Sequence, residues 1–577
     1  MASIKFSERS WRFSGLFVAA LLWLICFTPR LRSEVGASLR HAGAFDQFAV
    51  ASDHPLASEV GASILARGGN AADAAVATAL ALGVLHPASS GLGGGGFFLY
   101  YRALDRELFF LDFRECAPSK AHPTMFANGA SSEVGGLAVA LPGEPAGLEA
   151  ILDRFGSGRV SRREIAEAAA RLAEQGFPAS RSLSRYSAET PALDRDELFR
   201  SFFPPNSDRI PEGHLLRNLQ LAKTLRRFGV EGSRPFYQGD IAQAIVREVR
   251  KRGGILTMED FRNYRPIERK PIEGLRFGHR WVTAPPPSAG GVTLLQSLAF
   301  VEALLPHPRE GARFRHVLAE SWKGAFLDRM RYLGDPDFVQ VPVQSLLDPS
   351  RVRLRVERFQ PFLAQPSAVY DIDALLPTPE PQREGGTTHI CVVDGNGNVA
   401  ALTSTINLPF GARFSVLGMV MNDEMDDFAK GIGLPNAFGL PGGAANMIKP
   451  GKRPVSTMTP TIVFDGERPR LCIGGSGGSR IVTAVEQVAL FVLLLGDELE
   501  TALVRPRIHH QGIPDVLSHE GSLEAWIREG LGLRGHTLNS VEAIATVQAI
   551  EIRYTPDGRR LIFAGSDPRK GGAPSGR

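Results

Sequence analysis

The sequence predicts a layered fold of α/β or α+β class, and two observations support this. Helical patterns alternate with short strand-like segments from about residue 45 onward, and the last third of the chain is rich in strands. The 577 residues are 44% hydrophobic and 22% charged, which is typical of a globular protein and far from the composition of disordered chains. Beyond residue 45 we therefore expect one continuous globular region.

Charge and cysteine content exclude several classes of protein. Lys and Arg total 65 against 61 for Asp and Glu, a net charge of +4, and no basic run is present. Nucleic acid is therefore not an expected partner. The four cysteines lack C-x-x-C spacing, so neither a disulfide framework nor a thiolate zinc site is expected; they are Cys26, Cys116, Cys391 and Cys472.

The N-terminus has the order of an export signal. Basic residues in the first twelve positions precede an uncharged apolar stretch over residues 15–28. Fourteen residues suit the apolar part of a signal peptide better than a membrane span of about 20 residues. We therefore predict that residues 1–44 are a signal peptide or an N-terminal membrane anchor and that the protein is periplasmic or extracellular.

Two questions about this segment stay open. Small residues at 35–37 and 42–44 are candidate cleavage sites, whereas Arg30 and Arg32 follow the apolar stretch closely, which is unusual for a cleaved signal. An uncleaved anchor and a buried helix are the alternatives. No second stretch is long and apolar enough to span a membrane.

Helix signals open the globular region. Residues Ala57–Arg67 have helical spacing, and Asn70 begins an Ala-rich helix with Asp73 at its third position and Pro87 beyond its end. Further helices are expected at 241–251 and after Thr257, which forms a capping pair with Asp260.

Strand signals lie in two parts of the sequence, before and after a predicted connector. Apolar and aromatic segments predict strands at 97–102 and 108–113. A Pro-rich, weakly periodic stretch at 371–386 predicts an exposed connector. The strands expected after it are 388–394, 399–406, 416–421, 461–464 and 470–474.

Two motifs resemble binding sites without their context. Gly91–Gly96 matches G-x-G-x-x-G, but a loop precedes it and a strand follows, whereas dinucleotide binding needs a strand and then a helix. We interpret it as a glycine turn that lets backbones approach closely. His389, His509 and His510 lack partners at metal-ligand spacing and are expected to pack or form hydrogen bonds.

A hairpin at residues 386–407 brings polar side chains together. Its turn, Asp394-Gly-Asn-Gly-Asn398, lies between two strand-like segments. With the turn centred on residue 396, Thr387 lies opposite Thr405, and Asn407 shares the face of Thr405. The plain interpretation is a Thr-rich strand end, because Thr is common in strands.

Threonine can also be a nucleophile when its own α-amine acts as the base. No distant histidine is then needed, but the preceding peptide bond must be cut. Gly386, after the predicted connector, is a suitable residue at which the backbone can bend toward such a cut.

From about residue 45 to its C-terminus the chain resembles the γ-glutamyltranspeptidases, members of the N-terminal nucleophile hydrolase superfamily. The motifs that carry the resemblance are Gly68-Gly-Asn-Ala-Ala-Asp-Ala, Gly91–Gly96, Asp112-Phe-Arg-Glu, Phe236-Tyr-Gln-Gly, Gly253-Gly-Ile-Leu-Thr, Ala284-Pro-Pro-Pro-Ser-Ala-Gly-Gly, Thr387-Thr-His, Met425-Asp-Asp-Phe, Lys452-Arg-Pro-Val-Ser-Thr-Met-Thr-Pro, Gly474-Gly-Ser-Gly-Gly-Ser-Arg and Ser566-Asp-Pro-Arg.

The resemblance implies an α+β fold, a four-layer αββα sandwich whose one core is shared by two autocleaved subunits. The large subunit would be 45–386 and the small catalytic subunit 387–577. Thr387 would be the nucleophile, and Thr405 would orient its amine. The family's oxyanion-hole pair matches Gly477 and Gly478, where backbone N–H groups can approach a developing oxyanion. No metal or organic cofactor is implied.

The resemblance also implies a donor-binding site. Arg114 matches the residue that holds the donor's α-carboxylate, with Ser456 and Thr457 as a hydroxyl pair. The family usually has Ser at position 457, so Thr457 adds a methyl group. The residues expected to hold the α-ammonium are Asn407, Glu424 and Asp427.

A lid loop is implied at residues 429–450. Phe438 stands where relatives often have Tyr, so one hydrogen bond worth roughly 1 kcal/mol is lost. We expect a functional but looser lid, and a lid that excludes water favours transfer to an amine over hydrolysis.

The expected activity is cleavage of the γ-glutamyl amide of glutathione and related compounds, with transfer to water or to an amino acid or peptide. The expected partners are therefore this donor, such an acceptor and the chain's own two subunits as a heterodimer. Two alternatives remain. A glutaryl-type (cephalosporin) acylase shares the superfamily, but glutaryl lacks the ammonium that Asn407, Glu424 and Asp427 suit. An inactive exported γ-glutamyl-binding protein would lack the catalytic threonines and glycines.

Overall fold

The computed structural model describes residues 40–190, 193, 196–371 and 385–577, and Arg40–Arg577 form one compact unit. The predicted signal or anchor apart from its last five residues, and all but the ends of the predicted connector, lie outside these residues. Among the helices so described, none is both long and apolar enough to cross a membrane.

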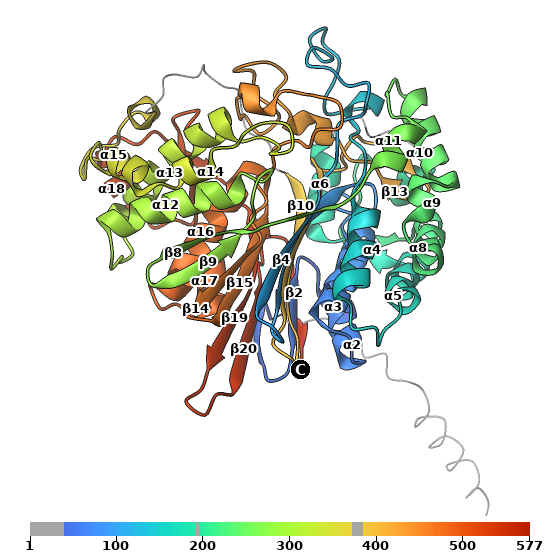
Figure 1. Cartoon of the computed structure of the whole chain (residues 1–577), viewed down its shortest axis with the longest axis horizontal. Coiled ribbons are helices and arrows are strands. Elements are labelled where there is room, and N and C mark those ends of the chain that lie inside the picture. Colours follow the sequence, from blue (N-terminus) through green and yellow to red (C-terminus); the bar gives the residue numbers. More distant parts are fainter. Residues whose placement is uncertain (1–39, 191–192, 194–195, 372–384) are drawn as a thin grey trace, which may run out of the picture. The chain divides into compact units, whose positions relative to one another are not determined.

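Two seven-stranded antiparallel sheets form the centre of this unit, as Figure 1 shows. The first sheet has the order β21-β2-β10-β11-β3-β4-β7, and the second has the order β1-β20-β19-β15-β14-β9-β8. The strands of the first sheet are β2 Ala49–Ser52, β3 Gly95–Arg102, β4 Glu107–Phe113, β7 Ile267–Arg269, β10 Gly386–Val393, β11 Val399–Asn407 and β21 Ser575–Gly576. Those of the second sheet are β1 Ala42–Phe45, β8 Ile272–Arg276, β9 His279–Thr283, β14 Thr461–Asp465, β15 Arg468–Ser476, β19 Thr546–Tyr554 and β20 Arg560–Ser566.

A helical layer covers the outer face of each sheet, and this confirms the four-layer αββα sandwich (Figure 1). The helices on the side of the first sheet are α2 Pro55–Ala66, α3 Ala71–Leu85, α4 Glu144–Phe155, α5 Arg162–Gln175, α8 Leu219–Glu231, α9 Arg234–Tyr237, α10 Asp240–Lys251 and α11 Met258–Asn263. Those on the side of the second sheet are α12 Gly290–Leu304, α13 Ala312–Tyr332, α14 Val343–Leu346, α15 Pro349–Val356, α16 Ile481–Leu493, α17 Leu499–Val504 and α18 Ala525–Leu533.

Short elements complete the described chain. The remaining helices are α6 Arg181–Glu189 and α7 Glu197–Phe202, with 3-10 turns η1 Gly136–Ala138, η2 Ser367–Tyr370, η3 Glu424–Asp427, η4 Ala444–Asn446 and η5 Gly478–Arg480. The remaining strands are β5 Phe177–Pro178, β6 Leu215–Leu216, β12 Ser415–Val416, β13 Met419–Val420, β16 Ile508–His509, β17 Leu517–Glu520 and β18 Leu538–Val541.

Strand β10 is buried on both faces, and its side chains divide between two parts of the core. Ile390 and Val392 pack with the helical layer that contains α3, whereas Cys391 and Val393 pack between the two sheets. This alternation follows from the two-residue period of a strand. Because both faces are covered, the second half of the strand, Ile390 to Val393, is continuously apolar.

The glycine turn was predicted correctly and lies against β11. A side chain at Gly94 would overlap the carbonyl oxygen of Thr405, and one at Gly96 would overlap that of Thr403. Only glycine allows this approach, which lets β3 pair with β11 directly beside Thr405.

Most local predictions are confirmed. Helix α3 begins with a capping box between Asn70 and Asp73, and α11 begins with one between Thr257 and Asp260. The predicted strands at 97–102, 108–113, 388–394, 399–406, 461–464 and 470–474 correspond to β3, β4, β10, β11, β14 and β15.

Two local predictions are corrected. The strand predicted at 416–421 is a tight hairpin of β12 and β13, because Leu417 and Gly418 both have positive φ angles, 51° and 81°. Gly386 is not exposed connector; it is buried and begins β10. The predicted boundary after residue 44 stays a prediction, and it lies within β1, which pairs with β20.

Gly94→Ala is expected to lower the free energy of unfolding by roughly 3 kcal/mol, or to prevent folding, because the new Cβ overlaps a backbone carbonyl that cannot move alone. Gly395→Ala is the matched control, since the nearest atom to its Cβ would be the carbonyl oxygen of Gln47 at 4.0 Å. Urea unfolding of both variants tests this, and equal midpoints would contradict it.

Candidate active site

The pairing of β10 with β11 places the two predicted catalytic threonines together. Thr387 lies directly opposite Thr405, in the register that the turn predicts. A bulge between Gly386 and Thr387 then sets Gly386 opposite Asn407. The extra residue of this bulge is Ile406 on β11, which faces the peptide bond that joins Gly386 to Thr387.

A chain of hydrogen bonds runs through the Thr405 hydroxyl. The Thr405 hydroxyl oxygen accepts a hydrogen bond of 2.9 Å from the backbone N–H of Asn407 and lies 3.2 Å from the Thr387 hydroxyl oxygen. The Thr405 hydroxyl donates its proton to the carbonyl oxygen of Gly386 at 2.8 Å. A hydroxyl has one proton to donate and two lone pairs to accept, so Thr387 is the donor to Thr405. Thr387, Thr405 and the Gly386 carbonyl are therefore connected.

The carbonyl of Thr387 is held by a buried lysine that sequence analysis missed. Lys570 Nζ donates to the Thr387 oxygen at 2.5 Å and lies 3.0 Å from the Asp53 carboxylate. Burial raises the pKa of Asp53, and the ammonium of Lys570 opposes that rise. Asp53 and Lys570 together therefore hold the backbone at the carbonyl of Thr387.

Strand register also places Arg114 near the threonines. Thr405 pairs with Gly95, and Gly96 pairs with Phe113, so Arg114, the residue after β4, continues the row that contains Thr387 and Thr405. Three strand spacings separate the row's ends, roughly 14 Å between Cα atoms. Arg114 itself is buried, with 1% of its side chain exposed.

Two buried carboxylates flank the Arg114 guanidinium. One nitrogen pairs with Glu424 and the other with Asp427. Burial raises the pKa of both carboxyl groups, while the positive charge of Arg114 opposes the rise. Glu115, 3.5 Å away from the guanidinium, has its pKa raised to about 8, chiefly by burial.

Three carboxylate oxygens beside Arg114 have no hydrogen-bond partner among the described residues: both oxygens of Glu115 and one of Glu424. Glu424 Oε2 is buried and receives no hydrogen bond from any residue that the structure describes. Such an acceptor is costly unless a ligand donates to it. The cluster thus combines a cation with an open carboxylate oxygen, an arrangement that matches the two charges of an amino acid.

Asn407 connects this cluster to the threonine pair. Its backbone has a φ angle of 74°, which Asn tolerates better than most residues. Its side-chain amide donates to the carbonyl of Asp423 at 3.1 Å, directly before Glu424. The predicted ammonium-binding residues thus meet at one end of β11.

The predicted hydroxyl pair lies on a segment beside Arg114. The guanidinium Nε donates to the carbonyl of Pro454 at 3.4 Å, two residues before Ser456. Thr457 accepts a hydrogen bond of 3.2 Å from Arg329, a buried residue of α13. Burial lowers the pKa of Arg329 to about 10, with Asp427 opposing this shift. Sequence analysis missed Arg329, because α13 carries charged residues throughout and no motif sets this one apart.

The predicted oxyanion glycines lie against the predicted lid. Gly477 and Gly478 have positive φ angles of 138° and 61°, and a Cβ at Gly385 would lie 2.7 Å from the Gly478 nitrogen. A Cβ at Gly478 would lie 2.6 Å from the ring of Phe438. The lid residue therefore covers the glycine pair, and Gln511 holds it by donating to the Phe438 carbonyl at 3.1 Å.

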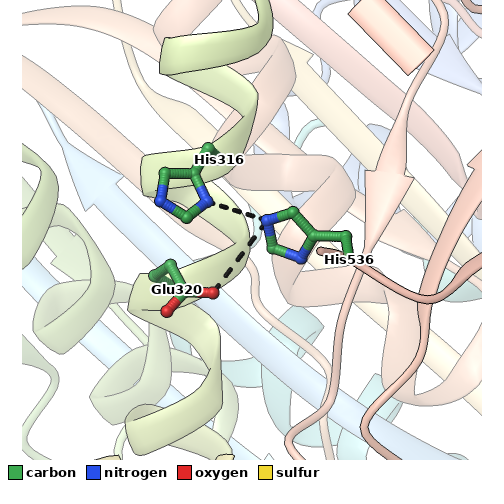
Figure 2. Close-up of side chains that lie close together, drawn as sticks. All are labelled: His316, Glu320 and His536. Atoms are coloured by element: carbon green, nitrogen blue, oxygen red, sulfur yellow. Dashed lines mark hydrogen bonds and ion pairs between the residues drawn. The ribbon is translucent and has the colours of Figure 1, made fainter. Parts of the chain in front are cut away.

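One cluster outside this site has the composition of a metal site. Figure 2 shows His316 and Glu320, one turn apart on α13, facing His536. The two histidines share a hydrogen bond of 2.8 Å, and Lys323 pairs with Glu320 at 2.9 Å. A proton and an ammonium thus already satisfy these groups, so we interpret the cluster as a structural hydrogen-bond network.

The other histidines behave as predicted. His389 contacts Thr403 at 2.8 Å, His509 contacts Thr483 at 2.9 Å, and His510 contacts Asp515 at 3.0 Å. Burial lowers the pKa of His389 and of His509 to about 3. Each is a neutral, hydrogen-bonded core residue.

Comparisons with known proteins agree with this geometry. A glutathione hydrolase proenzyme from Escherichia coli is 36% identical over 573 residues, which cover 96% of this chain and 97% of that protein. One from Bacillus subtilis is 35% identical and covers 88% of each chain.

Two solved structures show the same fold, that of the N-terminal nucleophile hydrolases. A cephalosporin acylase from Bacillus halodurans matches with a TM-score of 0.80 and 27% identity, covering 96% of this chain and 99% of that one. A γ-glutamyltranspeptidase from Helicobacter pylori matches with a TM-score of 0.51 and 38% identity, over 54% and 92% of the two chains. The γ-glutamyltranspeptidase family profile matches residues 57–577. The chain therefore belongs to the γ-glutamyltranspeptidase family.

Proposed function

We propose that this protein cuts itself between Gly386 and Thr387 and then acts as a γ-glutamyl hydrolase and transferase on glutathione and related compounds. The observation that carries the proposal is the hydrogen-bond chain from the Thr387 hydroxyl through Thr405 to the Gly386 carbonyl. The names of the E. coli and B. subtilis relatives, glutathione hydrolase proenzymes, support both the substrate and the self-cleavage.

Self-cleavage follows from that chain. The Thr387 oxygen attacks the Gly386 carbonyl carbon and passes its proton to Thr405, while the Thr405 proton moves toward the developing oxyanion on Gly386. Collapse returns the proton to the Thr387 nitrogen as the C–N bond breaks, which frees the α-amine of Thr387 and leaves an ester between Gly386 and the Thr387 oxygen. Water hydrolyses the ester, which releases a free carboxylate on Gly386 and the hydroxyl of Thr387.

The freed amine then serves as the base for turnover. It takes the Thr387 hydroxyl proton as the oxygen attacks the donor's γ-carbonyl, and it returns that proton to the leaving amine. Backbone N–H groups of Gly477 and Gly478 would stabilise the oxyanion. Water or an acceptor amine then releases the γ-glutamyl group from the Thr387 ester.

Donor recognition would use the charges around Arg114. The donor's α-carboxylate would meet Arg114 with Ser456 and Thr457, the latter oriented by Arg329. Its α-ammonium would meet Asn407, Asp427 and the open oxygen of Glu424. The ammonium offsets the cost of two buried carboxylates, and a neutral group cannot do this.

A glutaryl-type acylase is the second candidate, and the fold similarity to the B. halodurans cephalosporin acylase favours it. Glutaryl would leave Glu424 Oε2 buried without a donor, so we place it second. An inactive γ-glutamyl-binding protein has no use for the Thr387–Thr405 hydrogen bond and ranks last.

We further propose that the protein is exported and works as a heterodimer of residues 45–386 and 387–577. Strand β1 begins at Ala42 and belongs to the second sheet, so a signal cleaved at 35–37 leaves the fold intact, whereas cleavage after Ala44 removes most of that strand. Anchoring through residues 15–28 is the alternative.

Intact mass under denaturing conditions, with N-terminal sequencing, tests self-cleavage. Two chains are expected, one of which begins Thr-Thr-His-Ile-Cys. Thr387→Ala should stay a single chain, whereas Thr405→Ser, which keeps the hydroxyl, should cleave faster than Thr405→Ala. A folded wild-type protein that remains one chain would overturn the proposal and favour the binding-protein alternative.

Asp427→Asn should separate the two enzyme candidates. Weaker binding of the ammonium should raise KM for a γ-glutamyl anilide about tenfold or more, because a hydrogen bond between charges is worth about 1.5–3 kcal/mol. Turnover of the matching glutaryl anilide should be low and unaffected. Preference of the wild-type enzyme for the glutaryl substrate would instead identify an acylase.

Phe438→Tyr should raise the ratio of transfer to hydrolysis several-fold, because a ring hydroxyl can add a latch hydrogen bond of roughly 1 kcal/mol to the lid. Product analysis with glycylglycine as acceptor measures this ratio, and Phe438→Leu controls for the ring itself. An unchanged ratio in the Tyr variant would show that the lid does not depend on such a latch.

A further inference from the structure

Two buried cysteines face each other across the interface of the central sheets. Cys391 lies on β10 of the first sheet and Cys472 on β15 of the second, and these strands pack against each other. We propose that these two cysteines form a disulfide that joins the two sheets.

Their sulfur atoms are in direct contact. The two cysteines are free thiols in this structure, but their Sγ atoms lie only 2.6 Å apart, closer than non-bonded sulfur atoms pack and longer than a disulfide bond of about 2.05 Å, and both side chains are fully buried. The only other described cysteine, Cys116, lies three residues beyond the end of β4, forms a β-bridge with Leu141 and is not part of this contact. The sequence places the pair 81 residues apart, which hides it from any analysis of spacing.

The sheets come unusually close at this point, and a neighbouring glycine explains why. A side chain at Gly474 would overlap the imidazole of His389. Because side chains alternate along a strand, His389 shares the inward face with Cys391, and Gly474 shares that of Cys472. The missing side chain at Gly474 therefore lets β15 approach β10 beside the point where the two sulfur atoms meet.

The environment indicates when the bond would form. Burial raises the pKa of the Cys391 thiol well above its usual range, so the folded protein holds almost no thiolate there. Thiol–disulfide exchange at Cys391 would therefore take place before the two sheets pack together during folding. Each thiol loses one proton and one electron, and a disulfide oxidant of the export compartment is reduced to two thiols. Once buried, the bond is protected from reductants.

The bond would link the two halves of the catalytic machinery, and this consequence rests on the proposed function. Cys391 lies four residues after Thr387 on β10, and Cys472 lies five residues before Gly477 at the end of β15. A covalent link would therefore fix the nucleophile's strand against the strand that leads to the oxyanion glycines. Both cysteines lie in 387–577, so the bond would not join the two subunits.

Alkylation of the exported full-length protein tests the bond. The protein is unfolded in guanidinium with N-ethylmaleimide, with or without prior reduction, and its peptides are analysed by mass spectrometry. Without reduction we expect label on Cys116 but not on Cys391 or Cys472, whose peptides should be joined with the loss of two hydrogens. After reduction all three should be labelled. Full labelling of Cys391 and Cys472 without reduction would overturn the proposal.

Variants give a second readout. Cys391→Ala should expose Cys472 to label without reduction, whereas Cys116→Ser should leave the joined peptides unchanged. A reductant present during thermal unfolding should lower the wild-type Tm by a few degrees and leave that of the Cys391→Ala/Cys472→Ala variant unchanged. Equal Tm shifts in the wild-type protein and the double variant would contradict the disulfide. These readouts need no activity, so they stand apart from the test of self-cleavage.

Discussion

The antiparallel pairing of β10 with β11 is the interaction on which the site depends. It sets Thr387 opposite Thr405 and, through the bulge, brings the Gly386 carbonyl to the Thr405 hydroxyl. The same row of the sheet continues through Gly95 to Arg114, so one register aligns the two threonines with Arg114. A shift of one residue would turn every one of these side chains to the opposite face.

The helical layers and the glycines support the pairing of β10 with β11. The small side chains of α3 let a helix lie flat on β10 and β11. The glycines before β3 bring another backbone against Thr405 without a side chain between them. Burial on both faces excludes water from the strand ends, so the hydroxyl chain and the Arg114 ion pairs act in a medium of low dielectric constant, where they are stronger than in water.

Local signals were enough to predict the parts of the fold that short stretches of chain determine. The Asp-Gly-Asn-Gly-Asn turn set the register of β10 and β11, and capping residues set the starts of α3 and α11. The hairpin at Leu417 was missed because an apolar run hides a turn made by a non-glycine residue with positive φ. Strands β19 and β20 were not predicted, although they complete the second sheet.

Prediction of the site residues was likewise limited to those that local motifs mark. Family motifs led to Arg114, Glu424, Asp427 and Thr457, and the structure brings these together. Arg329 and Lys570 could not be found in this way, because each acts through a contact more than 100 residues distant in sequence. Long-range contacts of this kind depend on how layers stack, and no local pattern encodes them.

The order of strands has a consequence for assembly. In the first sheet β10 and β11 are enclosed between β2 and β3, and in the second sheet β1 and β9 flank strands from the C-terminal part of the chain. A cut before Thr387 would therefore leave two chains, and in both sheets strands of the C-terminal chain would be enclosed between strands of the other. They cannot separate without breaking the hydrogen bonds of several strand pairs at once, and if unfolded they would have to find each other in solution. The precursor can refold as one molecule, but the cut protein is maintained by slow unfolding rather than by reversible folding.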